Sequence, residues 1–230
     1  MNVSAPAALA NRVTRSGFAV SPAGRWTSVA GAVYVAAWIT GLLLLPSAPS
    51  ATGPADVLSD FYAAHGPVIV VQALLVHGLA GVALAVLAAT LPRAARVGGR
   101  VAVAVRAFGW SAAAVSLAQV GLTLAATLDV RTVTPAVTRD LVHAVDLADA
   151  VKLVLLAGFA TAATVLAARA GAAPRWLRVV AVALVVLLPL GAASFVVPNA
   201  LLGLLLVVSL PLLLTWTGAV AYQVGRHSLR

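Results

Sequence analysis

The sequence predicts an all-α fold, a polytopic membrane bundle of six transmembrane helices with both termini in the cytoplasm. Composition is the first reason, because 62% of the 230 residues are hydrophobic and only 9% are charged, whereas soluble domains carry roughly 25% charged residues. A soluble chain of this length could not bury so much apolar surface in one core. The spacing of the charged residues is the second reason, since a helix needs about 20 apolar residues to cross a bilayer.

Charge-free intervals define the six expected spans. The first apolar run stops at Pro46, and the run between Lys152 and Arg169 is too short to span, so its helix is expected to begin near Leu147. The long final run holds two spans that turn at Pro198-Asn199. The expected spans cover about 27–45, 67–91, 107–128, 147–168, 178–197 and 200–222 in a domain of residues 26–224, between a poorly ordered tail (1–25) and a C-terminal tail (225–230).

Charge sorting predicts the orientation. With the N-terminus in the cytoplasm, twelve basic residues fall inside and three outside, as the positive-inside rule requires. The abundance of Ala and Arg indicates a bacterial origin, so we expect a multi-pass protein of the bacterial plasma membrane. A cleaved signal peptide is disfavoured because the first apolar run is longer than a signal core. All six acidic residues fall outside, at Asp56, Asp60, Asp129, Asp140, Asp146 and Asp149.

Several classes of partner and cofactor are not expected. The chain contains no cysteine, which excludes disulfides and thiolate metal sites. Arginines are scattered singly between apolar runs and do not form the basic face that a nucleic-acid surface needs. We therefore expect the lipid bilayer as partner, no nucleic acid and no cofactor, and the sequence does not specify an oligomeric state.

Two outer segments carry the acidic residues. The segment 54–65 has helical spacing of apolar residues and is expected to lie flat on the interface, with Gly66-Pro67 as its stop. The segment 134–149 begins with a Thr134-Pro135 helix start, and a continuation into the fourth span is open. The two segments either roof an outward-facing cavity or are solvated connectors.

Five polar residues at span positions form the first candidate site. Asp149 and Lys152 stand three residues apart on one helix, an order that favours an ion pair, and Asp149 is expected near a helix start. If the pair is only structural, Lys152 snorkels outward. We expect Lys152→Ala to leave the bundle folded, and loss of the protein from the membrane on this change would show the pair to be structural. The deeper polar residues form a pocket with Lys152 if their helix faces meet. The candidate set is Gln72, His77, Gln119, Asp149 and Lys152.

A second candidate set lies among the outer segments. His and Asp side chains are acceptable zinc ligands and acid–base groups. No HExxH or similar spacing connects them, so a metal is not predicted, and no GxSxG elbow accompanies the serines. This set consists of Asp60, His65, His143 and Asp146.

Three short motifs give the chain a family resemblance. They are Trp38 to Gly41 with the aliphatic run to Pro46, Asp60-Phe61-Tyr62 with His65, and Pro174-Arg175-Trp176-Leu177. With these motifs the chain resembles the small six-span integral membrane proteins of actinobacteria. The resemblance implies the helical fold and the inner membrane, and it implies no activity.

Three functions are therefore left open. The first is a small transporter-like or accessory protein with an outward-facing polar mouth and a small molecule or lipid as ligand. The second is a membrane-embedded enzyme that acts on a lipid or isoprenoid, and the third is a structural subunit of a membrane complex. Convergence of His77, Gln119 and Lys152 on one cavity would favour the first, and approach of His65 to His143 the second.

Overall fold

The computed structural model describes residues 21–45, 48–197 and 199–228, and in these ranges the chain is helical and contains no strand. Seven α-helices are joined by short loops, with one π-helical segment (η1) and one 3₁₀ turn (η2). In chain order they are α1 (Pro22–Leu44), α2 (Ala55–Ala73), η1 (Leu74–Leu79), α3 (Ala80–Ala95), α4 (Gly99–Leu128), α5 (Pro135–Arg169), α6 (Arg175–Ala192), η2 (Ala193–Phe195) and α7 (Ala200–His227).

Six helical segments in the described ranges are long and apolar enough to cross a membrane, which confirms the predicted fold class of an integral membrane protein. α2, η1 and α3 count as one of them, because they form a single continuous helix of 41 residues. α5 is the most deeply buried of the six, with half of its most apolar stretch inside the bundle.

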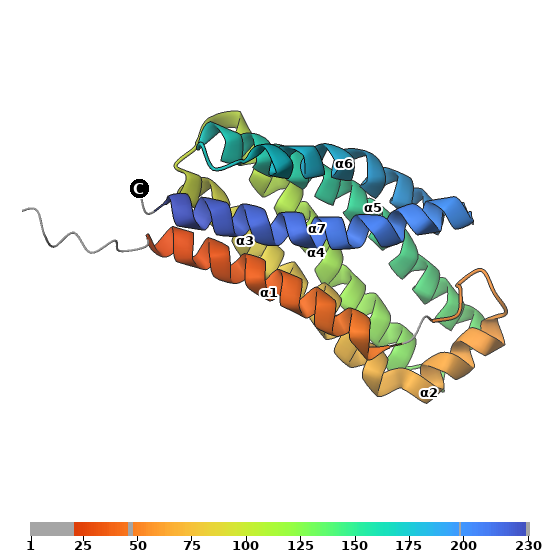
Figure 1. Cartoon of the computed structure of the whole chain (residues 1–230). Helices are drawn as coiled ribbons and strands as arrows, with labels where there is room; N and C mark the ends of the chain where they lie inside the picture. Colours follow the sequence, from red (N-terminus) through yellow and green to blue (C-terminus); the bar gives the residue numbers. More distant parts are fainter. Residues whose placement is uncertain (1–20, 46–47, 198, 229–230) are drawn as a thin grey trace, which may run out of the picture.

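The spans form a closed ring in chain order (Figure 1). Each span packs against the one before and the one after it, as expected for helices connected by short loops. The ring is closed by α1 and α7, which lie side by side at the N-terminal half of α1 and the C-terminal half of α7 and diverge beyond it (Figure 1).

Small residues allow α1 and α7 to approach each other closely. A Cβ atom on Gly31 would lie 2.3 Å from the Cβ of Ala221, and one on Gly225 would lie 2.1 Å from Ser28 Oγ. Close backbone approach through small residues is a common way to pack helices in lipid, where the hydrophobic effect does not drive association.

The segment around Gly66-Pro67 does not end a helix, contrary to the sequence prediction. α2 continues through Pro67 and passes into η1 and α3. Proline removes one backbone hydrogen bond and bends a helix rather than stopping it when packing supports both sides. Figure 1 shows α2 turned away from the line of α3. The other outer segment does continue into its span, since α5 is one helix of 35 residues.

The chain ends differ slightly from the expected domain limits. α1 starts at Pro22, where the Ser21 hydroxyl accepts a hydrogen bond from Gly24 N at 3.1 Å, and residues 1–20 of the expected tail lie outside the described ranges. α7 continues to His227, and residues 229–230 also lie outside these ranges. At the expected turn, the Asn199 side chain caps α7, while Pro198 is outside the described residues.

Two hydrophobic cores are present. The main core runs through the ring of spans. The second core is smaller and lies at the end of the bundle where α2 and α5 begin and α4 ends, next to Asp56, Asp129 and Asp140; we call it the acidic end. The second core is formed by the loop before α2, by α2 itself and by the adjoining ends of α4 and α5, through Ala51, Leu58, Tyr62, Ile69, Ala126, Val130 and Val142.

The α1–α7 contact predicts a clear difference between two glycine substitutions. Gly31→Ala places a Cβ against Ala221, so we expect the protein to lose about 1–3 kcal/mol of stability through overpacking. Gly121→Ala in α4 is the control, because outside the adjoining backbone of α4 no heavy atom lies within 4 Å of its Cβ position, and alanine favours the helix. Thermal unfolding of the purified protein in detergent measures both variants. Equal melting temperatures would contradict the close α1–α7 contact.

Candidate functional site

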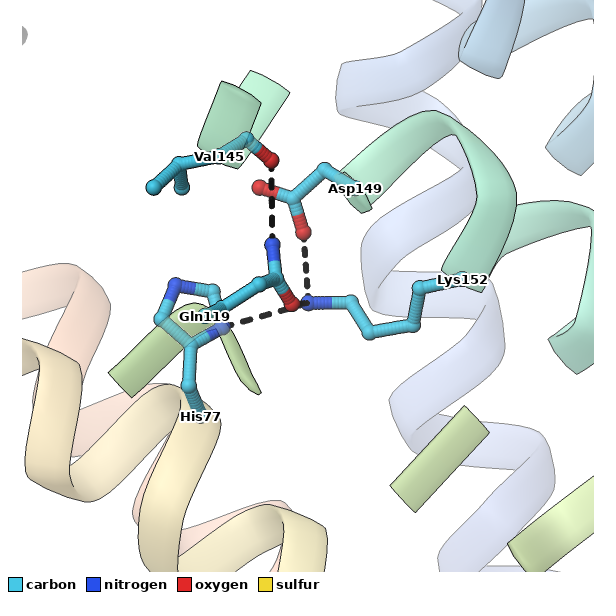
Figure 2. Close-up of polar contacts among 5 residues, drawn as sticks. All are labelled: His77, Gln119, Val145, Asp149 and Lys152. Atoms are coloured by element: carbon cyan, nitrogen blue, oxygen red, sulfur yellow. Dashed lines mark hydrogen bonds and ion pairs between the residues drawn. The ribbon is translucent and has the colours of Figure 1, made fainter. Parts of the chain in front are cut away.

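Four of the five residues in the first candidate set meet around the side chain of Lys152. Lys152 Nζ on α5 donates to Gln119 Oε1 on α4 at 2.9 Å and lies 3.2 Å from His77 Nδ1 on η1. Asp149, one turn earlier on α5, places Oδ1 2.5 Å from the same ammonium. Figure 2 shows the three acceptor side chains pointing toward Lys152 from different directions.

The three acceptors match the hydrogen-bonding capacity of the lysine. An ammonium group carries three N–H donors and no acceptor. The carboxylate, the amide oxygen and the imidazole nitrogen each accept one of them. His77 accepts at Nδ1 only as a neutral ring with its proton on Nε2, so this contact assigns the tautomer. The cluster then has a net charge of zero.

Burial explains why the lysine needs these partners. Lys152 is 2% exposed and Gln119 is fully buried, whereas the Asp149 side chain remains 22% exposed. A charged group taken out of water is stable only when it is paired and hydrogen-bonded. The expectation that Lys152 snorkels outward is therefore wrong for this structure, because its ammonium is held inside the bundle.

The structure also removes the expected helix-dipole contribution at Asp149. α5 begins at Pro135, about four turns before Asp149. The favourable effect of a helix N-terminus on a negative charge is confined to the first turn. The position of the carboxylate is therefore stabilised by Lys152 rather than by the start of the helix.

Neighbouring contacts hold the cluster in place. Gln119 Nε2 donates to Val145 O at 3.1 Å, which fixes the amide orientation and ties α4 to α5 (Figure 2). On α1, the Trp38 ring lies under the ammonium, with 5.4 Å between Lys152 Nζ and the ring centroid, a cation–π distance. Gly41 lets α1 approach η1, because a Cβ there would lie 2.2 Å from Val76 Cγ2.

A cavity of about 200 Å³ adjoins the cluster at the acidic end. It lies between the two cores, since its wall includes Trp38 and Val76 of the main core and Tyr62 and Ile69 of the second core. Most of the wall is apolar, and Lys152 is not part of it. The wall residues with polar side chains include Gln72, His77, Thr123 and Asp149, together with Tyr62.

Gln72 belongs to the cavity but not to the lysine cluster. Its Nε2 donates to Gly41 O on α1 at 3.2 Å. This bond links α2 to α1 beside the cavity. Gln72 lies on the cavity wall and does not contact Lys152.

The second candidate set does not gather into a site. Asp60 and His143 are exposed, and His65 stacks on Phe61 with 4.4 Å between the ring centroids. In the part of the chain that the structure describes, no group of three or more His, Cys, Asp or Glu side chains is placed to hold a metal ion. The arrangement gives no support to a metal centre built from Asp60, His65, His143 and Asp146.

Sequence reasoning missed three residues of the site, Trp38, Tyr62 and Thr123. Thr123 stands four residues after Gln119 and therefore shares its helix face, a signal that the sequence does contain. Trp38 and Tyr62 occur in the motifs that carry the family resemblance, but no spacing connects either of them to His77 or Lys152.

Comparison of the chain with protein-family models, with curated proteins and with solved structures finds no match. The chemistry of the site is therefore derived from its own residues and their contacts.

The buried pair predicts a characteristic double-mutant cycle and replaces the expectation that Lys152→Ala is harmless. Lys152→Met and Asp149→Asn each leave one charge unpaired, so each is expected to lower stability by about 2–4 kcal/mol. The double variant removes both charges, and we expect it to recover most of this loss. Melting temperatures in detergent measure the cycle.

An exposed pair on the same helix serves as the control. Arg139 Nε and Asp140 Oδ1 are 3.7 Å apart, and their side chains are 43% and 75% exposed. Asp140→Asn should therefore change stability by no more than about 0.5 kcal/mol. Additive effects of the two changes at Asp149 and Lys152 would show that the two charges do not depend on each other.

Proposed function

We propose that the protein is a small transporter-like membrane protein and that the cavity at the acidic end binds its ligand. The observation that carries this proposal is the buried, fully partnered lysine beside a cavity, within a segment long enough to span a membrane. Ionisable residues inside membrane spans are costly and commonly mark substrate or ion pathways.

A purely structural role explains the cluster less well. Neutral polar residues suffice to hold membrane helices together, and a buried ion pair often contributes no more stability than well-packed apolar side chains. Here the pair is joined by residues of three other spans and borders a cavity on the side of Asp149. These features support a role in binding.

The surrounding helix geometry supports movement at the site. His77 lies in the π-helical segment η1. Pro67, earlier in the same long helix, interrupts its backbone hydrogen bonding. π-helical segments occur frequently at functional sites, and proline positions are where helices bend. The long helix therefore has one local irregularity on the cavity wall, at His77, and a second at Pro67, two residues before the wall residue Ile69. Such irregularities suit a protein that opens and closes access to a binding site.

We also propose that the acidic end faces outward and that both termini lie in the cytoplasm of a bacterial plasma membrane. The support is the charge distribution, because basic residues concentrate at the opposite end of the bundle, around the α3–α4 and α5–α6 loops. The cavity then opens toward the outside.

Cysteine labelling tests orientation and cavity access together. The chain has no cysteine, so each substitution introduces a unique thiol. We expect Thr132→Cys, in the exposed loop at the acidic end, to react with a membrane-impermeant thiol reagent in intact cells. Gly98→Cys, in the α3–α4 loop, should react only after permeabilisation. Thr123→Cys, on the cavity wall, should react from the same side as Thr132→Cys, but more slowly because Thr123 is nearly buried.

The three variants separate two ways in which the proposal can fail. Reaction of Gly98→Cys in intact cells, with Thr132→Cys protected, would reverse the orientation. Protection of Thr123→Cys on both sides, with the loop thiols behaving as expected, would show that the cavity is closed and would favour a structural subunit. The unmodified cysteine-free protein supplies the blank for both experiments.

A further inference from the structure

We infer that the cavity takes a small organic cation, an amine with a compact apolar body, with its ammonium beside Asp149. This inference rests on the proposed ligand-binding role of the cavity and names the class of ligand. It follows from the charge on the wall, from the aromatic rings around it and from its size.

The formal charge on the described part of the wall is negative. Asp149 lies on the wall, whereas Lys152 does not, and neither do the two arginines near this end, Arg131 and Arg139. The exposures agree, because 22% of the Asp149 side chain is accessible against 3% of the Lys152 side chain. The ion pair therefore presents its carboxylate to the cavity and keeps its ammonium behind.

The hydrogen bonds of the pair also indicate that Asp149, and not Lys152, is available to a ligand. The three donors of Lys152 are matched by three protein acceptors, so an anionic ligand could be bound by this ammonium only if a partner were displaced. Asp149 contacts Lys152 through Oδ1, and its second oxygen points away from the lysine in Figure 2. A carboxylate accepts several hydrogen bonds, so Asp149 can accept from a ligand ammonium while remaining near Lys152.

Aromatic rings complete the environment of a cation. Trp38, Phe61 and Tyr62 all line the cavity, and the faces of such rings attract ammonium groups. One ring in this cluster already does so, because the ammonium of Lys152 lies over Trp38. The remaining wall is mostly aliphatic, including Leu42 and Ile69, and suits an alkyl or aryl group.

The volume limits the size of the ligand. An apolar cavity of roughly 150 Å³ is large enough for benzene, and this cavity measures about 200 Å³. A single ring with a short ammonium arm fits such a space, whereas a phospholipid does not. Benzylammonium is therefore a suitable probe, with benzyl alcohol and benzoate as neutral and anionic molecules of similar shape.

The experiment titrates the three probes into the purified full chain in detergent and follows tryptophan fluorescence. We expect benzylammonium to change the emission in a saturable way and the other two probes to have at most a tenth of its affinity. Trp38→Phe should remove most of the fluorescence change, because Trp38 is on the cavity wall. Binding of each probe is measured in parallel by calorimetry, which does not depend on the tryptophan.

The variants should change the affinity for benzylammonium in a direction that non-specific binding to an apolar cavity would not produce. Lys152→Met removes the cation that competes for Asp149, so benzylammonium should bind about tenfold more tightly or better. The double variant Asp149→Asn/Lys152→Met is neutral and is expected to fold, and it should lose the preference for the cation. Asp140→Asn, in the exposed pair, should bind as the unchanged protein does.

The outcomes distinguish this inference from the proposed function. Tighter binding of benzoate or benzyl alcohol than of benzylammonium would overturn the cation class and leave the cavity as a ligand site. Weaker binding of benzylammonium by Lys152→Met, or unchanged preference in the double variant, would overturn the role assigned to Asp149. Binding of none of the probes would also overturn the inference, while labelling of Thr123→Cys decides independently whether the cavity is accessible.

Discussion

The pairing of one buried ammonium determines how the spans are rotated about their axes. Lys152 lies where water is excluded, so acceptors must surround it, and they come from α5 itself, from α4 and from η1. The ring of Trp38 brings α1 to the same point. Four of the six spans are thereby connected through a single side chain, and the faces of these helices cannot turn independently without leaving a charge unpaired.

The cavity is a consequence of two cores that meet at this point. The main core packs the spans against one another, and the second core packs α2 against the ends of α4 and α5. The two cores meet near the lysine cluster. There, polar side chains occupy positions that apolar side chains fill in the core on either side. The boundary between the two cores lies beside η1, so the π-helical segment in the described part of the chain borders the Asp149–Lys152 pair.

The six spans were predictable because lipid imposes a length and an apolar composition on every helix that crosses it, as the runs before Pro46 and after Arg178 show. The Asp149–Lys152 pair was predictable from helical spacing. The meeting of His77, Gln119 and Lys152 was not, because it depends on close packing such as that of Gly41 against Val76, which no local pattern encodes. The predicted stop at Pro67 failed because tertiary contacts support the helix on both sides of it.

The closure of the ring by α1 and α7 has a consequence for how the protein is made. The two helices are separated by almost the whole described sequence, yet their glycines fit against each other more closely than larger residues would allow. During synthesis the face of α1 that carries Gly24 and Gly31 has no protein partner until α7 has entered the bilayer. This contact therefore forms only after α7 has been inserted, and a chain that stops before α7 leaves that face of α1 unpaired.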